Sequence, residues 1–174
     1  GKHNIENLLA ALTLGYQFGL PIKQMIKAAK TFKGLPHRLE FITSINHVDF
    51  YNDSKSTNAI STKTAINSLL EKYSQLVLIL GGIAKQENYS ELFELISEKV
   101  KTVVLIGDSS KFFSEQLSVP TLKIARSMEE AVGLSKSLAK GGAIVLSPAC
   151  ASFDMFDDFN DRGDQFKHHV NEGS

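Results

Sequence analysis

The chain has 174 residues, 43% of them hydrophobic, which is enough for one domain with a buried core and part of a neighbouring domain. Acidic and basic residues balance at 19 each, so no field of one sign is available to hold nucleic acid or an anionic membrane by charge alone. The single cysteine, Cys150, excludes an intramolecular disulfide and fits a reducing compartment. No long apolar run and no signal peptide is evident. We therefore expect a cytoplasmic protein with no membrane insertion and no nucleic-acid partner.

The first part of the chain predicts a pair of helices. Apolar residues recur at helical spacing over residues 5–16 and again over 22–32, which together indicate a short helical hairpin. Between residues 34 and 38 the apolar period changes from that of helices to that of strands. This change indicates a domain boundary, and we expect one domain over residues 1–34 and another over 35–174.

The second part of the chain alternates between strand and helix patterns. Strands are predicted at residues 39–45, 48–51, 76–80, 103–106, 121–124 and 143–146. Helices are predicted at residues 62–72, 89–98, 109–116, 128–139 and 159–169. Such alternation indicates right-handed crossovers between strands. The expected fold class is α/β, with a Rossmann-like, mostly parallel sheet that has helices on both faces.

Loops that follow strands carry the ligand sites in open sheets of this kind. The loop at residues 52–58, with the sequence NDSKSTN, combines a carboxylate, carboxamides, an ammonium group and hydroxyls before a predicted helix. That composition suits a phosphorylated or carboxylated ligand at a helix N-terminus. Helix capping by Ser56, Thr57 or Asn58 explains the same residues equally well. The loop at 147–152 has small residues that would let a ligand approach the backbone.

Other polar residues have two interpretations each. Lys85 follows a glycine pair and is either a charge for a carboxylate or a solvated lysine after a turn. The pair His37-Arg38 is suited to phosphate recognition or is an exposed linker. Cys150 lacks a local histidine partner and is interpreted as a packed side chain. Because neighbouring histidines on a helix point in different directions, His168 and His169 are interpreted as surface residues, and we expect no metal site.

Several motifs together, in one order, resemble those of one family. They lie at residues 1–7, 34–40, 52–58, 81–85 and 146–154. The chain resembles the Mur ligases and, among them, those that add D-glutamate to UDP-N-acetylmuramoyl-L-alanine. Other Mur ligases and folylpolyglutamate synthases share the architecture but usually carry different residues where this chain has Asn-Asp-Ser-Lys.

The resemblance implies an ATP-dependent amide ligase of peptidoglycan precursor synthesis that works as a monomer. ATP phosphorylates the substrate carboxylate, and the amine of D-glutamate attacks the resulting acyl phosphate. The chain resembles the end of the family's central ATPase domain, followed by the C-terminal domain. It contains no Walker-type phosphate motif, so ATP and Mg²⁺ are expected to bind mainly outside it. The fragment alone is expected to be inactive.

By position, the resemblance implies two sets of contacts. The nucleotide contacts would be Asn4, Asn7, His37, Arg38 and Asp53. The D-glutamate pocket would contain Lys55, Thr57, Lys85, Ser152, Phe153 and Phe159. Lys55 would also act in catalysis. The chain departs from the family pattern around Lys85, because Ile83-Ala84 precedes it and Gln86 follows it. The resemblance therefore does not determine the backbone path into Lys85 or the role of this residue. Another amide ligase of the superfamily and a stand-alone binding module of the same fold are the alternatives.

Overall fold

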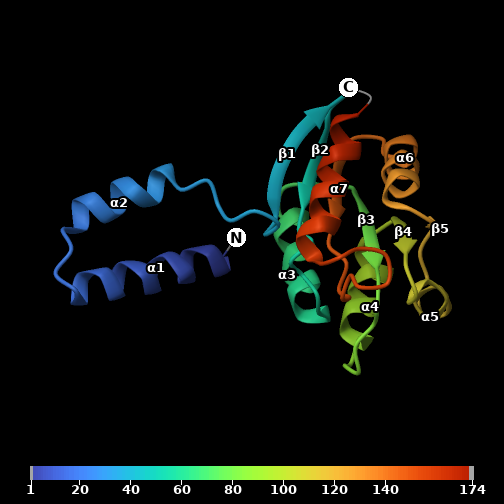
Figure 1. Ribbon diagram of the computed structural model, residues 1–174, viewed down its shortest axis with the longest axis horizontal. Coiled ribbons are helices and arrows are strands. Elements are labelled where there is room, and N and C mark those ends of the chain that lie inside the picture. Colours follow the sequence, from blue (N-terminus) through green and yellow to red (C-terminus); the bar gives the residue numbers. More distant parts are fainter. Residues whose placement is uncertain (1, 173–174) are drawn as a thin grey trace. The chain divides into compact units, whose positions relative to one another are not determined.

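The computed structural model describes the backbone of residues 2–172 and the side chains of residues 5–172 (Figure 1). It divides into two compact units, Gly1–Leu35 and Pro36–Ser174. The first unit contains helices α1 (Lys2–Gln17) and α2 (Ile22–Thr31), which contact each other as the predicted hairpin. Its apolar side chains are largely open to solvent, and no residue of α2 is buried.

The second unit contains a six-stranded sheet in the order β1-β2-β6-β3-β4-β5. Its strands are β1 (Glu40–Ile45), β2 (Val48–Asn52), β3 (Leu76–Gly81), β4 (Thr102–Ile106), β5 (Thr121–Ile124) and β6 (Gly142–Leu146). The pairing of β1 with β2 is antiparallel, and the other four pairings are parallel. The predicted mostly parallel, Rossmann-like sheet is confirmed.

Five helices cover the two faces of this sheet (Figure 1). They are α3 (Ala59–Leu70), α4 (Ser90–Lys99), α5 (Ser110–Gln116), α6 (Met128–Leu138) and α7 (Phe159–Asn171). Because successive strand residues point to opposite faces, Leu78 packs toward α3, α4 and α5, whereas Ile79 packs toward α6 and α7. Both side chains are fully buried, and each such burial stabilises the fold by roughly 1.5–3 kcal/mol. Among the described helices, none is long and apolar enough to cross a membrane.

Side-chain caps determine where helices α3 and α7 begin. Helix α3 begins at Ala59 instead of residue 62, because the side chain of Asn58 caps it by accepting a hydrogen bond from the Ser61 amide at 2.9 Å. Capping by the polar loop is therefore real, and Asn58 provides it. Helix α7 begins at Phe159, as predicted, and Asp158 caps it by accepting from the amides of Asn160 and Asp161.

The order of the strands determines where the polar loops meet. β6 lies between β2 and β3, and all three run in the same direction. The loops after these strands, at residues 52–58, 81–85 and 147–152, therefore leave the same edge of the sheet side by side.

Replacing Gly81 by Ala tests the close approach of β3 to its neighbour. Gly81 has φ +125°, and an added Cβ would lie 2.1 Å from the carbonyl oxygen of Ile106. We expect Gly81→Ala to lower the free energy of unfolding by roughly 3 kcal/mol. Gly133, in α6, has nothing within 4 Å of an added Cβ, so Gly133→Ala should raise it by up to about 1 kcal/mol. Urea unfolding measures the free energy of unfolding of both variants. Equal values for Gly81→Ala and Gly133→Ala would contradict the described packing.

The reactivity of Cys150 tests its burial. Its side chain is fully buried, and burial raises the pKa of the thiol to about 11. Since only the thiolate reacts, we expect alkylation at pH 8 to be at least about 100-fold slower in the native chain than in the unfolded chain. The test is to follow thiol modification with and without denaturant. Equal rates would show that Cys150 is open to solvent.

Candidate functional site

The loops after β2 and β6 are held together by their own backbone and side chains. The Asp53 amide donates to the carbonyl of Leu146 at 2.8 Å, which extends the strand pairing by one residue. Further along, the Ala149 amide donates to the carbonyl of Ser56 at 2.9 Å. The hydroxyl of Ser147 donates to Oδ2 of Asp53 at 2.7 Å. These contacts make the two loops one structural unit.

Asp53, a predicted nucleotide contact, is 5% exposed. Its Oδ1 accepts from the Leu39 amide at 3.0 Å, and its Oδ2 accepts from Ser147. Burial raises the pKa of this carboxyl, while hydrogen bonds from Ser56 and Ser147 act in the opposite direction. The carboxylate thus joins the linker and both loops, and its contact with a nucleotide stays a prediction.

Lys55 and Phe159, both predicted for the amino-acid pocket, contact each other. The Lys55 ammonium lies 3.6 Å from the centroid of the Phe159 ring, a distance typical of a cation–π interaction. The same ring forms a T-shaped pair with the ring of His37, with the two ring centroids 6.1 Å apart. One side chain at the start of α7 therefore lies between a residue predicted for the amino acid and one predicted for the nucleotide.

Lys85 and Thr57 form a second contact within the predicted pocket. The Lys85 ammonium donates to Oγ1 of Thr57 at 3.3 Å, and the Lys85 amide donates to the hydroxyl of Tyr89 at 3.0 Å. Ile83 pairs with Ala151 through two backbone hydrogen bonds of 2.9 and 3.0 Å. This bridge determines the path into Lys85 and joins its loop to the loop after β6.

Ser152 and Phe153 follow that bridge but differ in exposure. Ser152 is buried, whereas the Phe153 side chain is 70% exposed. Residues 152–158 form turns and bends and α7 begins at Phe159, so Phe153, Phe156 and Phe159 do not lie on one helix. Phe156 packs into the core beside α6 and α7.

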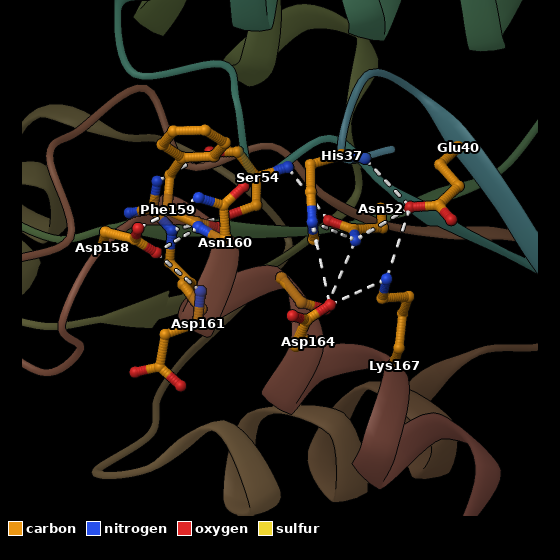
Figure 2. Close-up of polar contacts among 12 residues, drawn as sticks. His37, Glu40, Asn52, Ser54, Asp158, Phe159, Asn160, Asp161, Asp164 and Lys167 are labelled. Carbon is orange, nitrogen blue, oxygen red and sulfur yellow. Dashed lines mark hydrogen bonds and ion pairs between the residues drawn. The ribbon is translucent and has the colours of Figure 1, made fainter. Parts of the chain in front are cut away.

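The linker residue His37 is buried against α7, as Figure 2 shows. Its Nδ1 lies 3.0 Å from Nδ2 of Asn52, which also donates to the carbonyl of Gly163 at 3.3 Å. A Cβ on Gly163 would lie 2.1 Å from His37 Nδ1, so glycine leaves room for the ring. The His37 amide donates to Glu40 at 2.9 Å, and the neighbouring Arg38 is exposed.

Two predicted nucleotide contacts belong to the first unit. Asn7 lies on α1 with its side chain exposed. The side chain of Asn4 lies outside the described residues. Both assignments stay predictions.

The pair of histidines near the end of α7 behaves differently from the expectation. Nε2 of His168 lies 2.9 Å from one oxygen of Glu172, and Nδ1 of His169 lies 3.2 Å from the other. The expectation that the two rings point in different directions was wrong, because Glu172 lies within reach of both. The contacts are side-chain contacts at a helix end, and we assign no metal to them.

Sequence reasoning gave no role to Arg162, which lies beneath the two loops. It is 0% exposed and donates to Oγ of Ser54 at 2.9 Å, to the carbonyl of Ser54 at 2.9 Å and to the carbonyl of Cys150 at 3.1 Å. One signal was present in the sequence. Arg162 shares helical spacing with Phe159, Phe166 and Val170, so a basic residue occupies the apolar face of α7.

Comparison with known proteins agrees with this architecture. Residues 37–150 match the family described as "Mur ligase, glutamate ligase domain". The chain is 45% identical over 170 residues to a UDP-N-acetylmuramoylalanine–D-glutamate ligase of Marinobacter nauticus, covering 96% of this chain and 38% of that protein. It is 46% identical over 173 residues to the protein of the same name from Cytophaga hutchinsonii, covering 98% of this chain and 38% of that protein. The chain therefore spans about two fifths of the length of these relatives.

A solved structure shows the same fold at low sequence identity. The UDP-N-acetylmuramate-alanine ligase of Thermotoga maritima superposes with a TM-score of 0.69 and 16% identity, covering 100% of this chain and 39% of that one. Since the family match covers more than half of the chain, the protein belongs to the Mur ligase family, and the sheet that carries the candidate site is its glutamate ligase domain.

Proposed function

We propose that this chain is the C-terminal part of an ATP-dependent ligase that adds D-glutamate to UDP-N-acetylmuramoyl-L-alanine in peptidoglycan precursor synthesis. The relatives at 45% and 46% identity carry the name of that activity. The observation that carries the proposal is the meeting of Lys55, Thr57 and Lys85 at one edge of the sheet.

This edge has the chemistry that D-glutamate requires. The amino acid brings two carboxylates, which bind best to cations and hydroxyl donors. Lys85 and Thr57 already contact each other and offer an ammonium and a hydroxyl to one carboxylate. Ser152, Phe153 and Phe159 complete the pocket, and Lys55 neutralises negative charge near the reacting carbonyl.

The reaction proceeds through an acyl phosphate in this proposal. ATP phosphorylates the carboxylate of UDP-N-acetylmuramoyl-L-alanine, the amine of D-glutamate attacks the carbonyl, and phosphate leaves as the amide forms. The main contribution of this chain is to hold the amine close to that carbonyl. Its own steps are binding, orientation and charge neutralisation.

ATP and Mg²⁺ bind mainly to the rest of the protein in this proposal. Arg38 fits a phosphate contact, because its guanidinium is exposed beside the buried His37. Asp53 fits a nucleotide less directly, since both of its oxygens already accept hydrogen bonds within the domain. Asn4 and Asn7 are proposed as contacts on the adenine side.

The helix pair at residues 1–34 is proposed to be the end of the central ATPase domain. Its exposed Leu9, Phe18 and Phe32 support this, because a stable domain normally buries such side chains. A monomeric state and a cytoplasmic location belong to the same proposal, and the single free Cys150 is compatible with that location.

Substituting the two lysines in the full-length protein tests the pocket. We expect Lys55→Ala and Lys85→Ala each to raise the KM for D-glutamate by about tenfold or more, because each removes a cation from the pocket. The KM for ATP should change by less than about twofold. The control is Lys111→Ala, an exposed lysine on α5, which should leave both constants unchanged. Unchanged kinetics in both lysine variants would contradict the assignment.

A panel of amino acids separates the proposed ligase from other members of the superfamily. The full-length protein is assayed for phosphate release with UDP-N-acetylmuramoyl-L-alanine, ATP and a series of D- and L-amino acids. We expect D-glutamate to be preferred over L-glutamate by a factor of about 100 or more, because two carboxylates at fixed positions discriminate between enantiomers. Preference for another amino acid would indicate a different ligase of the same fold.

A further inference from the structure

We propose that Arg162 is a positioning residue for the D-glutamate pocket, which acts by holding the peptide between Ser54 and Lys55, the carbonyl of Cys150 and the start of α7 in one arrangement. The inference rests on the proposed function, which supplies D-glutamate as the substrate. The contacts of Arg162 come from the structure alone.

The burial of Arg162 needs an explanation beyond packing. Its side chain is 0% exposed, and among the described residues it forms no ion pair with a carboxylate. Desolvation lowers the pKa of the guanidinium to about 10, and Asp154 opposes this shift only through space. Burying a charge without an ion pair is unfavourable, so its hydrogen bonds must offset much of the desolvation.

The guanidinium uses its forked shape to join two loops. Nε donates to Oγ of Ser54 and Nη2 to the carbonyl of Ser54, both at 2.9 Å. Nη1 donates to the carbonyl of Cys150 at 3.1 Å. The Ser54 carbonyl belongs to the peptide bond that precedes Lys55, and Cys150 lies two residues before Ser152. One rigid group therefore bonds to the backbone beside residues of the pocket on both loops.

Ser54 passes the connection on to α7. Its hydroxyl accepts from Arg162 and donates to the carbonyl of Phe159 at 2.7 Å. Figure 2 shows Ser54 beside Phe159. Because Ser54 precedes Lys55, this relay sets the position of the Lys55 backbone relative to the Phe159 ring, and so supports the cation–π contact between them.

The charge of Arg162 also suits an amino acid with two carboxylates. A cation buried beneath the loops is weakly screened, so its field reaches the pocket more strongly than that of an exposed lysine. A lysine at this position would keep the charge but would lose the fork that reaches two loops at once. Arg162→Lys therefore separates the two contributions.

The test uses the full-length protein with Arg162→Lys and Ser54→Ala. The matched control is Arg126→Lys, because Arg126 is exposed before α6. Circular dichroism first establishes that each variant is folded. We expect Arg162→Lys to raise the KM for D-glutamate by about tenfold and Ser54→Ala by about threefold. The KM values for ATP and the UDP-linked substrate should stay within about twofold.

Amide hydrogen exchange gives a second readout that needs no substrate. The Lys55 amide donates to the carbonyl of His37 at 3.0 Å, and the Ala149 amide donates to Ser56. Both amides should exchange at least about tenfold faster in Arg162→Lys than in the wild type, while the amides of β4 keep their rates.

The two readouts distinguish failure of the inference from failure of the proposed function. Wild-type exchange rates at Lys55 and Ala149 in the folded Arg162→Lys variant would overturn the positioning role, whatever the substrate. A common increase in all three KM values would also overturn it, because that pattern indicates general loosening. If the wild-type enzyme shows no turnover with D-glutamate, but the Lys55 and Ala149 amides exchange faster in Arg162→Lys, only the substrate assignment would be overturned.

Discussion

The parallel pairing of β2 with β6 is the constraint on which the site depends. Both strands end at the same edge of the sheet, and the hydrogen bond from the Asp53 amide to Leu146 continues the pairing into the loops. Asp53 and Ser54 are buried there, so their polar groups must be bonded inside the domain. Ser147 and Arg162 meet this requirement and join the loops in doing so.

Buried and exposed residues have different roles within residues 52–58. Asn52, Asp53, Ser54 and Ser56 are buried and bonded to the linker, to α7 and to the loop after β6. Lys55 is exposed between them. The loop is therefore a structural junction, and in the proposed function its exposed part is also the ligand surface, which would explain why its composition is richer in polar groups than a helix cap requires. Because these hydrogen bonds already hold the backbone in place, less conformational entropy is lost when a ligand binds.

Local patterns predicted the strands and their mostly parallel pairing well, because strands buried on both faces are continuous apolar runs and their alternation with helices indicates a parallel sheet. Strands 76–80 and 121–124 and the start of α7 at Phe159 agree closely with the structure. The positions of the loops at residues 52–58, 81–85 and 147–152 could be predicted as well, because each loop follows a predicted strand. The contacts beneath them were not, because Arg162 lies more than 100 residues beyond Ser54 and the pairing depends on tertiary packing. The contact of His168 and His169 with Glu172 depends on rotamers, which residue spacing does not determine.

A crystal structure of the full-length protein with D-glutamate and ADP would test the central claim, that the loops at this edge form a preformed pocket for the amino acid. We predict one carboxylate of D-glutamate within hydrogen-bond distance of Lys85 and Thr57. The backbone of residues 52–58 and 147–152 should shift by less than about 1 Å relative to the described arrangement. D-glutamate bound at another edge of the sheet, or loops rebuilt around it, would contradict the account.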